Sequence, residues 1–299
     1  MINQIKAGDI ALVGLALGLS GAVHPRALAA SPAPEPAVPS EVRSDLPIAQ
    51  AAPAFLSFQE WCEARDSLAA ATQQTISILL NELRTEDCLE ANRRASVVTL
   101  LNLTGYQLSD ISPLSTFPLL TELVLHNNQI TDISPLAALP NLTRLYLSGN
   151  LIADVTPLAN LERLRFLVLM DNDLVSLAGL GEIDALQELY LNENQIAEVG
   201  ELARLTNLNK LYLSRNQIQD VSPLGSLTSL RVLDISSNQV ANVSPLVNLV
   251  NLQQLNLNRN RVSDAGPLRS LSSLQQLYLY NNPVQNFTCP NNSEAICFI

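Results

Sequence analysis

Four cysteines are the residues of this sequence best suited to metal binding, nucleophilic chemistry or crosslinking. Cys62 and Cys88 lie near one end of the chain and Cys289 and Cys297 near the other, and no CxxC pair occurs. Zinc sites usually bring such ligands together at short spacings, so the pattern does not favour zinc. Four cysteines permit three connectivities, and pairing within each end is the simplest choice in an oxidising compartment.

Acid and base catalysis has little support in this sequence. His24 and His126 are the two histidines, and no GxSxG, HExxH or glycine-rich phosphate loop occurs. Asp171 and Glu193 could be neighbours, but an open surface lacks the enclosed pocket that such catalysis normally uses. We therefore predict a protein that is not an enzyme and needs no cofactor.

The composition predicts a folded, acidic protein. Of 299 residues, 47% are hydrophobic and only 4% aromatic, and the formal net charge is -11. Such a chain is too apolar to be disordered. A nucleic acid or an anionic membrane is an unfavourable partner, because both require a basic surface.

A 22-residue repeat dominates the sequence and must position any functional side chain. Its frame reads LxxLxLxxNxIxDIxPLxxL, and its asparagine position recurs without insertion or deletion. The series begins with Tyr106 and continues with Asn128, Asn150, Asn172, Asn194, Asn216, Asn238, Asn260 and Asn282. A fixed period of this length with LxxLxLxxN is typical of the leucine-rich repeat, a solenoid.

Each part of the frame has a structural role. The two leucines of LxL point to the same side of a strand, so stacked copies bury a continuous apolar column. The asparagine amide can satisfy backbone groups where the chain turns, so the ladder Asn128 to Asn282 is interpreted as structural. The DIxPL segment predicts a short helical turn on the convex side. Gly179 and Glu201 replace its proline in two repeats, where we expect a different bend.

The N-terminal residues are typical of a targeting segment followed by a linker. Residues 1–29 contain an uncharged run and the pattern Ala27-Leu28-Ala29, which predicts a cleaved signal peptide; an uncleaved anchor and a buried helix are the alternatives. Residues 30–55 are rich in proline and alanine and predict an extended spacer, with plain disorder as the alternative.

Both ends of a solenoid expose apolar surface and need caps. Residues 56–95 are predicted to be a helical cap closed by a Cys62–Cys88 disulfide, starting with a capping box at Ser57 and Glu60. Residues 96–284 are predicted to form nine repeats, and residues 285–299 a cap closed by a Cys289–Cys297 disulfide.

The 22-residue class with xIxDIxPLxxL resembles the bacterial internalin-like repeat proteins, and also the intracellular repeat regulators of protein phosphatase 1. The resemblance covers Val97 to Val284. It implies an α/β solenoid with a right-handed curved parallel sheet, convex short 3-10 turns and an N-terminal helical cap. The cysteine pairs resemble the secreted bacterial members more closely. No LPxTG sorting signal or wall-binding module accompanies the repeats, so we expect a soluble extracytoplasmic protein without stable membrane insertion; an intracellular regulatory subunit is the alternative.

The varying residues lie six, four and two positions before each asparagine and should form rows across the concave sheet. Five of the six tyrosines fall in these rows, which is typical of a protein-binding surface, although LYL is also a common form of the repeat. Charges on adjacent strands could pair with each other or belong to a recognition patch. The predicted ligand-binding residues are Arg144, Tyr146, Phe166, Met170, Tyr190, Lys210, Tyr212, Asp234, Tyr278 and Tyr280.

Overall fold

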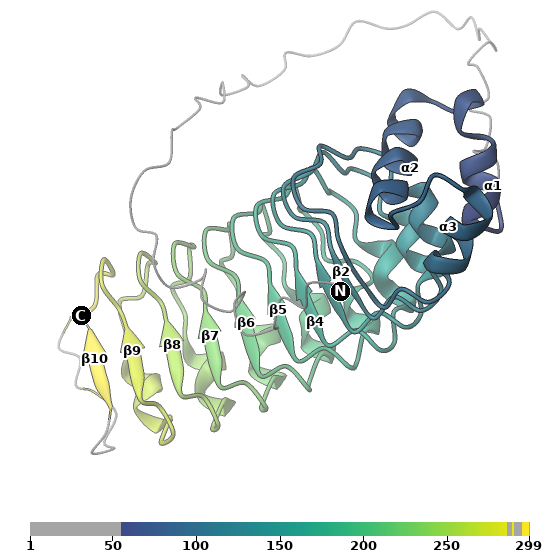
Figure 1. Ribbon diagram of the computed structural model, residues 1–299. Helices are drawn as coiled ribbons and strands as arrows, with labels where there is room; N and C mark the ends of the chain where they lie inside the picture. Colours follow the sequence, from purple (N-terminus) through teal and green to yellow (C-terminus); the bar gives the residue numbers. More distant parts are fainter. Residues whose placement is uncertain (1–54, 286–288, 290–294, 299) are drawn as a thin grey trace, which may run out of the picture. The chain divides into compact units, whose positions relative to one another are not determined.

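A computed structural model describes residues 55–285, 289 and 295–298. The predicted signal peptide and nearly all of the predicted linker therefore lie outside the described residues. The described chain forms one curved, open, parallel sheet whose ten strands follow the order of the sequence (Figure 1). They are β1 (Leu100–Asn102), β2 (Glu122–Val124), β3 (Arg144–Tyr146), β4 (Phe166–Val168), β5 (Glu188–Tyr190), β6 (Lys210–Tyr212), β7 (Val232–Asp234), β8 (Gln254–Asn256), β9 (Gln276–Tyr278) and β10 (Ile296–Phe298).

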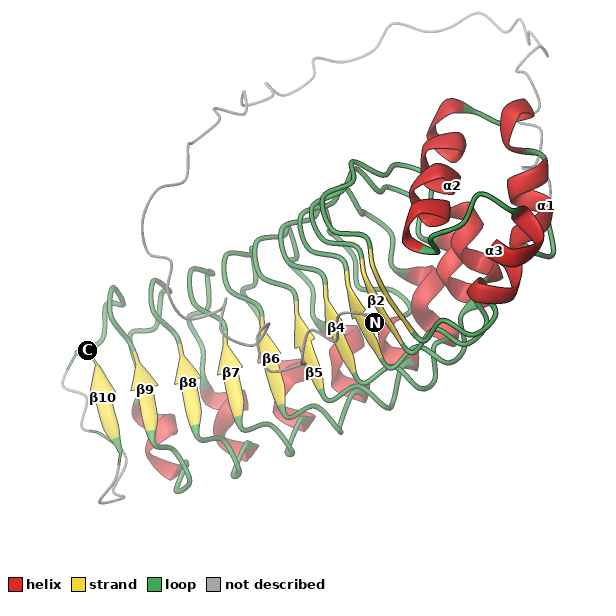
Figure 2. Cartoon of the chain, viewed as in Figure 1, coloured by secondary structure: helices red, strands yellow, loops and turns green. Residues whose placement is uncertain are grey.

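Short 3-10 helices return the chain between strands. Figure 2 shows the strands along one side of the coil and these turns along the other. Seven of the eight have five residues, whereas η5 has three, and Gly179 before it adopts a left-handed φ of +89°. The proline replaced by Gly179 thus marks an altered turn, but the turn at Glu201 keeps its five residues. The turns are η2 (Ser112–Thr116), η3 (Ser134–Ala138), η4 (Thr156–Asn160), η5 (Leu180–Glu182), η6 (Gly200–Arg204), η7 (Ser222–Ser226), η8 (Ser244–Asn248) and η9 (Gly266–Ser270).

The core is a set of apolar columns that run through the repeats. In β5 the inward residue Leu189 is fully buried, as is Leu191 two residues later, while Tyr190 between them faces the concave side. Strand pairing places Leu189 opposite Leu167 and Leu211, so the same alternation repeats in every coil. The 22-residue period therefore keeps each leucine in contact with its equivalents and keeps each outward position in a row.

The asparagine ladder satisfies backbone groups inside the coil, as the sequence predicts. Asn194 shows the pattern: its Nδ2 donates to the carbonyl oxygens of Leu169 at 2.9 Å and Leu191 at 3.1 Å, and its Oδ1 accepts from the backbone N–H of Leu174 at 3.1 Å. The same bonds recur along the series. Replacement of the amide would leave buried donors and an acceptor unpaired, each at about 1–3 kcal/mol.

The aspartate of DIxPL has a local role that the sequence analysis did not assign. Asp132 Oδ1 accepts from the backbone N–H of Ser134 at 2.8 Å, and Asp220 makes the same bond to Ser222. The carboxylate thus fixes the entry into the 3-10 turns that carry this aspartate, where a proline follows and leaves no N–H of its own.

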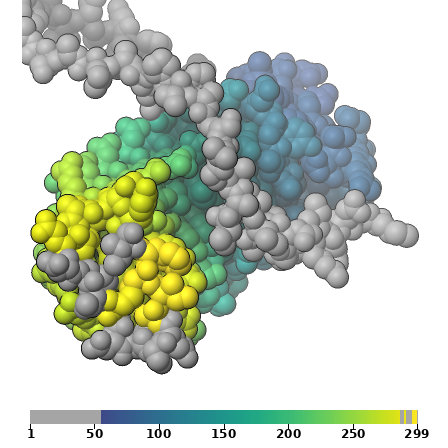
Figure 3. Space-filling view, turned by 90° about the vertical axis from the view of Figure 1, so that its left-hand side faces the viewer, coloured from purple at the N-terminus to yellow at the C-terminus, as the bar shows by residue number. Residues whose placement is uncertain are grey.

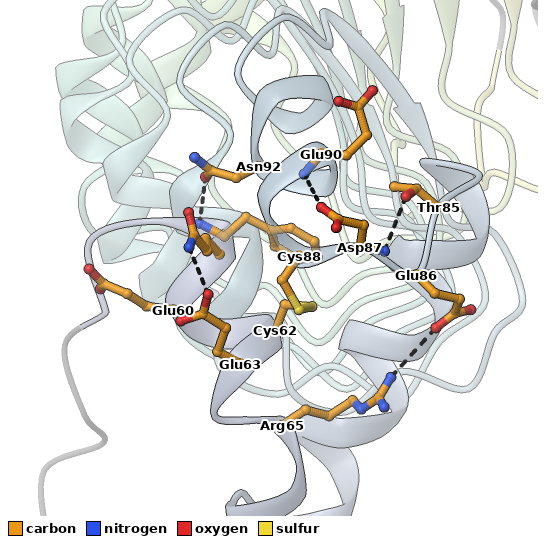
Figure 4. Close-up of a disulfide and its surroundings, with 12 residues drawn as sticks. Glu60, Cys62, Glu63, Arg65, Thr85, Glu86, Asp87, Cys88, Glu90 and Asn92 are labelled. Atoms are coloured by element: carbon orange, nitrogen blue, oxygen red, sulfur yellow. Dashed lines mark hydrogen bonds and ion pairs between the residues drawn. A yellow bond between two sulfur atoms is a disulfide. The ribbon is translucent and has the colours of Figure 1, made fainter.

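Three α-helices form the N-terminal cap: α1 (Phe58–Glu63), α2 (Ala70–Glu82) and α3 (Cys88–Ala95), with the 3-10 helix η1 (Arg65–Ser67) between the first two. The Cys62–Cys88 disulfide joins α1 to α3 (Figure 4), and the loop-entropy effect of such a bridge is about 3 kcal/mol. Ser57 caps α1 by accepting from Glu60 N–H at 3.3 Å. The Glu60 carboxylate accepts from Leu56 N–H, so the predicted capping box is shifted by one residue.

The cap joins the repeats through apolar and polar contacts. Phe58 is fully buried, and its ring meets that of Phe117 at 5.5 Å in the first repeat. On α2, Thr75 Oγ1 donates to the backbone oxygen of Asp110 at 2.6 Å. These contacts cover the apolar end that the first coil would otherwise expose.

The C-terminal cap contains a tenth strand, which the sequence analysis did not predict. β10 pairs in parallel with β9, with Cys297 opposite Leu277, and Cys297 packs against the core. A disulfide joins Cys297 to Cys289. The view onto this end in Figure 3 shows the last described repeats in yellow. Among the described residues, no helix is both long enough and apolar enough to span a membrane.

Candidate functional site: the concave face

The concave face is the strand side of the coil, formed by the outward residues six, four and two positions before each asparagine. Because strands pair in register, equivalent residues of successive repeats are direct neighbours, as Arg144 and Phe166 are. All ten sequence-predicted site residues lie in these rows. We call the concave side chains of β2 to β6, and of the segment between each of these strands and its asparagine, the aromatic half. Those of β7 to β9 and of the corresponding segments after them are the amide half.

Five rings form a continuous series across the aromatic half, here called the aromatic cluster. Centroid distances are 5.4 Å from His126 to Tyr146, 5.0 Å from Tyr146 to Phe166 and 5.3 Å from Phe166 to Tyr190. Tyr190 then stacks on Tyr212 at 4.6 Å with an angle of 8° between the rings. Such contacts are each worth about 0.5–1.5 kcal/mol beyond area burial, so the cluster stabilises this half of the sheet.

An apolar layer supports the cluster. Val124, Tyr146 and Val168 form a buried group at the fourth position before successive asparagines, and Met170 packs against it half-buried. Tyr146 is only 3% exposed, which differs from the outward, accessible position that the sequence analysis assumed. The reason is that the rings of His126 and Phe166 and the Arg144 guanidinium lie against it.

Cations of the aromatic half are paired with carboxylates on the preceding strand. Lys210 Nζ lies 3.1 Å from Glu188 and Arg144 Nε 3.8 Å from Glu122. The Arg144 guanidinium also stands 4.5 Å from the centre of the Phe166 ring and donates to the Tyr146 hydroxyl. Pairing within the chain, one of the two interpretations of these charges, is thus present.

The pKa values of the tyrosines in the cluster are raised. Burial raises the pKa of Tyr190, and the hydroxyl also donates to Glu188 Oε2 at 2.9 Å, which raises the pKa further. Burial likewise raises the pKa of Tyr146 and of Tyr212. These three phenols therefore stay protonated at neutral pH.

His126 is a member of the cluster that the sequence analysis missed. Its Nδ1 accepts from the backbone N–H of Ser148 at 3.2 Å, and burial lowers the pKa of the imidazole. A neutral ring is required for that bond, since a protonated Nδ1 cannot accept. The signal was in the sequence, because His126 occupies the row two positions before Asn128.

Polar, uncharged side chains dominate the amide half. Gln254 donates to Gln276 at 2.9 Å, and the oxygens of Asn256 and Asn258 accept backbone N–H groups. Asp234 is engaged in the same way, by Ser236 N–H at 2.9 Å. These contacts occupy amide and carboxylate oxygens on a part of the face with few rings.

Two predicted aromatic residues lie apart from the cluster, at the last strands. Tyr278 stacks on Phe298 of β10 with a centroid distance of 4.7 Å, and Tyr280 is 58% exposed. Phe298 was not predicted, because β10 lies outside the repeat frame. The ten predicted residues therefore form two groups, one on β3 to β6 and one on β9, with Asp234 between them.

The arrangement offers contact area and hydrogen bonds. Within the described residues, no three His, Cys, Asp or Glu side chains converge as metal ligands. The concave carboxylates Glu122 and Glu188 each face a cation at ion-pair distance. A wide, curved surface of this kind is suited to contact another macromolecule.

The profile of the family described as Leucine Rich repeats (2 copies) matches residues 98–138, 118–160, 140–182, 184–226, 206–248 and 250–292. The chain belongs to the leucine-rich repeat family. No curated protein matches the sequence. The family assignment accounts for the solenoid, the inward leucines and the asparagine ladder from Asn128 to Asn282.

Solved structures place this leucine-rich repeat protein near the internalins. An internalin (inlF) from Listeria monocytogenes is 29% identical with a TM-score of 0.60, and the match covers 74% of each chain. An internalin C2 (inlC2) from the same organism is also 29% identical with a TM-score of 0.60, covering 76% of this chain and 91% of that one. The repeats are therefore internalin-like.

A plant receptor ectodomain has a similar solenoid. The leucine-rich repeat ectodomain of the Arabidopsis thaliana receptor kinase GASSHO1/SCHENGEN3, solved in complex with Casparian strip integrity factor 2, is 29% identical with a TM-score of 0.54. The match covers 61% of this chain and 24% of that one. The solenoid thus resembles scaffolds that include a ligand-binding ectodomain.

Proposed function

We propose that the protein is a non-enzymatic, extracytoplasmic scaffold that holds a protein partner on its concave face. The observation that carries the proposal is the aromatic cluster, of whose five rings all but Tyr146 are half-buried, together with the cations beside it. Arg144 and Lys210 expose 39% and 42% of their side chains beside the rings. Aromatic and arginine side chains with partial exposure are typical of the energetic centres of protein interfaces.

The ten predicted residues take different parts in this proposal. Met170, Phe166 and Lys210 present atoms to a partner, whereas Tyr146 acts from below by fixing the rings above it. Tyr190 and Tyr212 offer ring edges, since stacking covers one face of each. Asp234, Tyr278 and Tyr280 extend the contact surface toward the C-terminal end, and Arg144 borders it on the N-terminal side.

An extracytoplasmic location is supported by cysteine chemistry. All described cysteines are in disulfides, which persist in oxidising compartments and are rare in the cytosol. Mass spectrometry of the native protein under non-reducing conditions tests this part. A chain that begins after Ala29 with both disulfides intact agrees with the proposal. Retention of Met1 with four free thiols would instead favour an intracellular regulator.

The binding site is tested with two matched double variants. Met170→Arg with Lys210→Glu alters the concave face, and Leu119→Arg with Arg204→Glu makes comparable residue changes near the convex turns. Lys210 and Arg204 each pair with a glutamate one repeat earlier, Glu188 and Glu182, so the lost ion pairs also correspond. After circular dichroism confirms folding, crosslinking and pull-down from the native source compare the two.

We expect a specific partner to be lost with the concave double variant and kept with the convex one. If both variants keep the same partners as the wild type, binding does not use this face and the proposal is wrong. Loss in both would point to the fold rather than the site and would also contradict it.

A further inference from the structure

Charge is distributed unevenly along the solenoid. Residues 55–204 contain 20 Asp and Glu against 8 Lys and Arg, whereas residues 205–285 contain 3 Asp and Glu against 6 Lys and Arg. The net charges are therefore -12 and +3. A protein with a formal net charge of -11 thus has a basic C-terminal part, which a partner approaching the amide half would meet first.

Three exposed arginines, Arg231, Arg259 and Arg261, border the amide half, and we call them the arginine group. Arg231 immediately precedes β7, and Arg259 and Arg261 follow β8 by three and five residues. The ion pairs found among the described residues include none of the three. In the aromatic half, by contrast, Arg144 and Lys210 each face a glutamate.

The arginine group lies on both sides of the face. Arg231 precedes its strand, while Arg259 holds the position directly before a ladder asparagine, after its strand. Six positions of the repeat separate the two sites, which is at most about 20 Å of extended chain, and the left-handed φ of +55° at Arg259 shortens this span. Between them lie Gln254, Asn256 and Asn258, whose amides both donate and accept hydrogen bonds. The one carboxylate there, Asp234, already accepts from Ser236 N–H.

We infer that the amide half docks an acidic, extended peptide segment of the protein partner. Carboxylates up to about six residues apart in that segment meet the arginine group at the two borders, and its backbone groups meet the glutamine and asparagine amides between them. We choose an acidic segment because of charge complementarity: arginines without an ion-pair partner among the described residues attract anionic groups at low salt. The inference rests on the proposed function, since it assigns partner chemistry to part of the same face.

The experiment uses a displayed library of random 12-residue peptides, selected on the folded protein at 50 mM NaCl. Selected peptides are then synthesised with a fluorophore, and anisotropy gives their Kd values. Arg231→Glu, Arg259→Glu and Arg261→Glu are combined in a site variant. The control combines Arg84→Glu, Arg163→Glu and Arg269→Glu, which are exposed arginines elsewhere, so both variants change net charge equally.

We expect the selected peptides to carry an excess of Asp and Glu. Their Kd should rise at least 10-fold in the site variant, less than 3-fold in the control, and several-fold between 50 and 300 mM NaCl as salt screens the charges. Equal weakening in both variants would overturn the inference, because only overall charge would then matter.

Other outcomes separate this inference from the proposed function. Neutral or basic peptides that the Met170→Arg, Lys210→Glu variant no longer binds would overturn the inference and leave concave binding intact. If every substitution on the concave face leaves peptide binding unchanged, both the inference and the proposed function are wrong. A second copy as occupant would show as salt-sensitive self-association in sedimentation velocity, lost only in the site variant, and would overturn the inference. Stronger binding of a single-stranded oligonucleotide than of acidic peptides would do the same.

Discussion

The two halves of the concave face use the same backbone positions for different purposes. In the aromatic half, rings pack on rings and each cation named above has a carboxylate on the preceding strand. In the amide half, side chains bond mainly to neighbouring backbone and amide groups, and arginines at the borders are unpaired among the described residues. A regular solenoid can therefore carry packed rings and paired charges on one part of its concave face and have unpaired charges beside another part.

The largest expected difference between the halves is in stability. Tyr146→Ala removes a ring that is 3% exposed and contacts two other rings, so we expect a loss of about 3 kcal/mol in the free energy of unfolding. Asn256→Ala changes the equivalent position in the amide half. There one half-buried acceptor of a backbone N–H is lost, and we expect a change below about 1 kcal/mol.

Urea unfolding followed by circular dichroism measures both variants against the wild type. Equal losses would contradict the division of the face, because they would mean that the solenoid distributes stability evenly whatever side chains its concave rows carry. The Tyr146→Phe variant is the control for the ring itself. It keeps the packing and should lose much less than Tyr146→Ala.

The sequence predicts the repeats well because one physical requirement recurs in each of them. Inward leucines and a buried asparagine must return once in every repeat, so strand positions and concave rows follow by counting. Counting fails at the C-terminal end. The spacing from β9 to β10 is shorter than the repeat period, and β10 lacks LxxLxLxxN, so pairing of Cys297 with Leu277 had no signal in the frame.

The repeat pattern also does not predict how deeply each residue of a row is buried. Tyr146 and Tyr278 occupy equivalent positions, yet Tyr146 is buried between Val124 and Val168 while Tyr278 is half-buried against Phe298. Tyr146 is also covered by the rings of His126 and Phe166 and by the Arg144 guanidinium, whereas the ring contact of Tyr278 is the one with Phe298. The frame gives the direction of a side chain, and the neighbours determine how much of it a partner can reach.

A smaller difference is expected from two tyrosine hydroxyls with corresponding geometry. Tyr190 donates to the carboxylate of Glu188, whereas Tyr278 donates to the amide oxygen of Gln276 at 3.2 Å. Hydrogen bonds to charged groups are the stronger kind, so at pH 7.5 Tyr190→Phe should cost about 1 kcal/mol and Tyr278→Phe less. Equal costs at this pH would show that the charge of Glu188 adds nothing.

The cost of Tyr190→Phe should also depend on pH. The pKa of Tyr190 is raised in the folded protein, so its contribution to stability is complete below the unfolded pKa of about 10 and falls as the pH rises above it. Phenylalanine does not ionise, and the difference between wild type and variant should therefore shrink between pH 7.5 and pH 10.5. Urea unfolding at the two pH values measures this, and a constant difference would contradict the raised pKa.

The smallest expected effect concerns His126, at the N-terminal border of the aromatic cluster. Burial lowers its pKa in the folded protein, so the unfolded chain binds the proton more readily. Its contribution to stability is then complete above the unfolded pKa of about 6.5 and declines as the pH falls below it. We expect the free energy of unfolding of the wild type to fall through this group between pH 7.5 and pH 5.

The amide half supplies the matched substitution for this test. Asn258 occupies the row of His126, and its Oδ1 accepts from the N–H of Tyr280 just as His126 Nδ1 accepts from Ser148. His126→Asn should therefore keep the hydrogen bond and remove the titration, so its unfolding free energy should fall less than that of the wild type on acidification. If both fall equally, the imidazole of His126 has no part in the acid sensitivity of the protein.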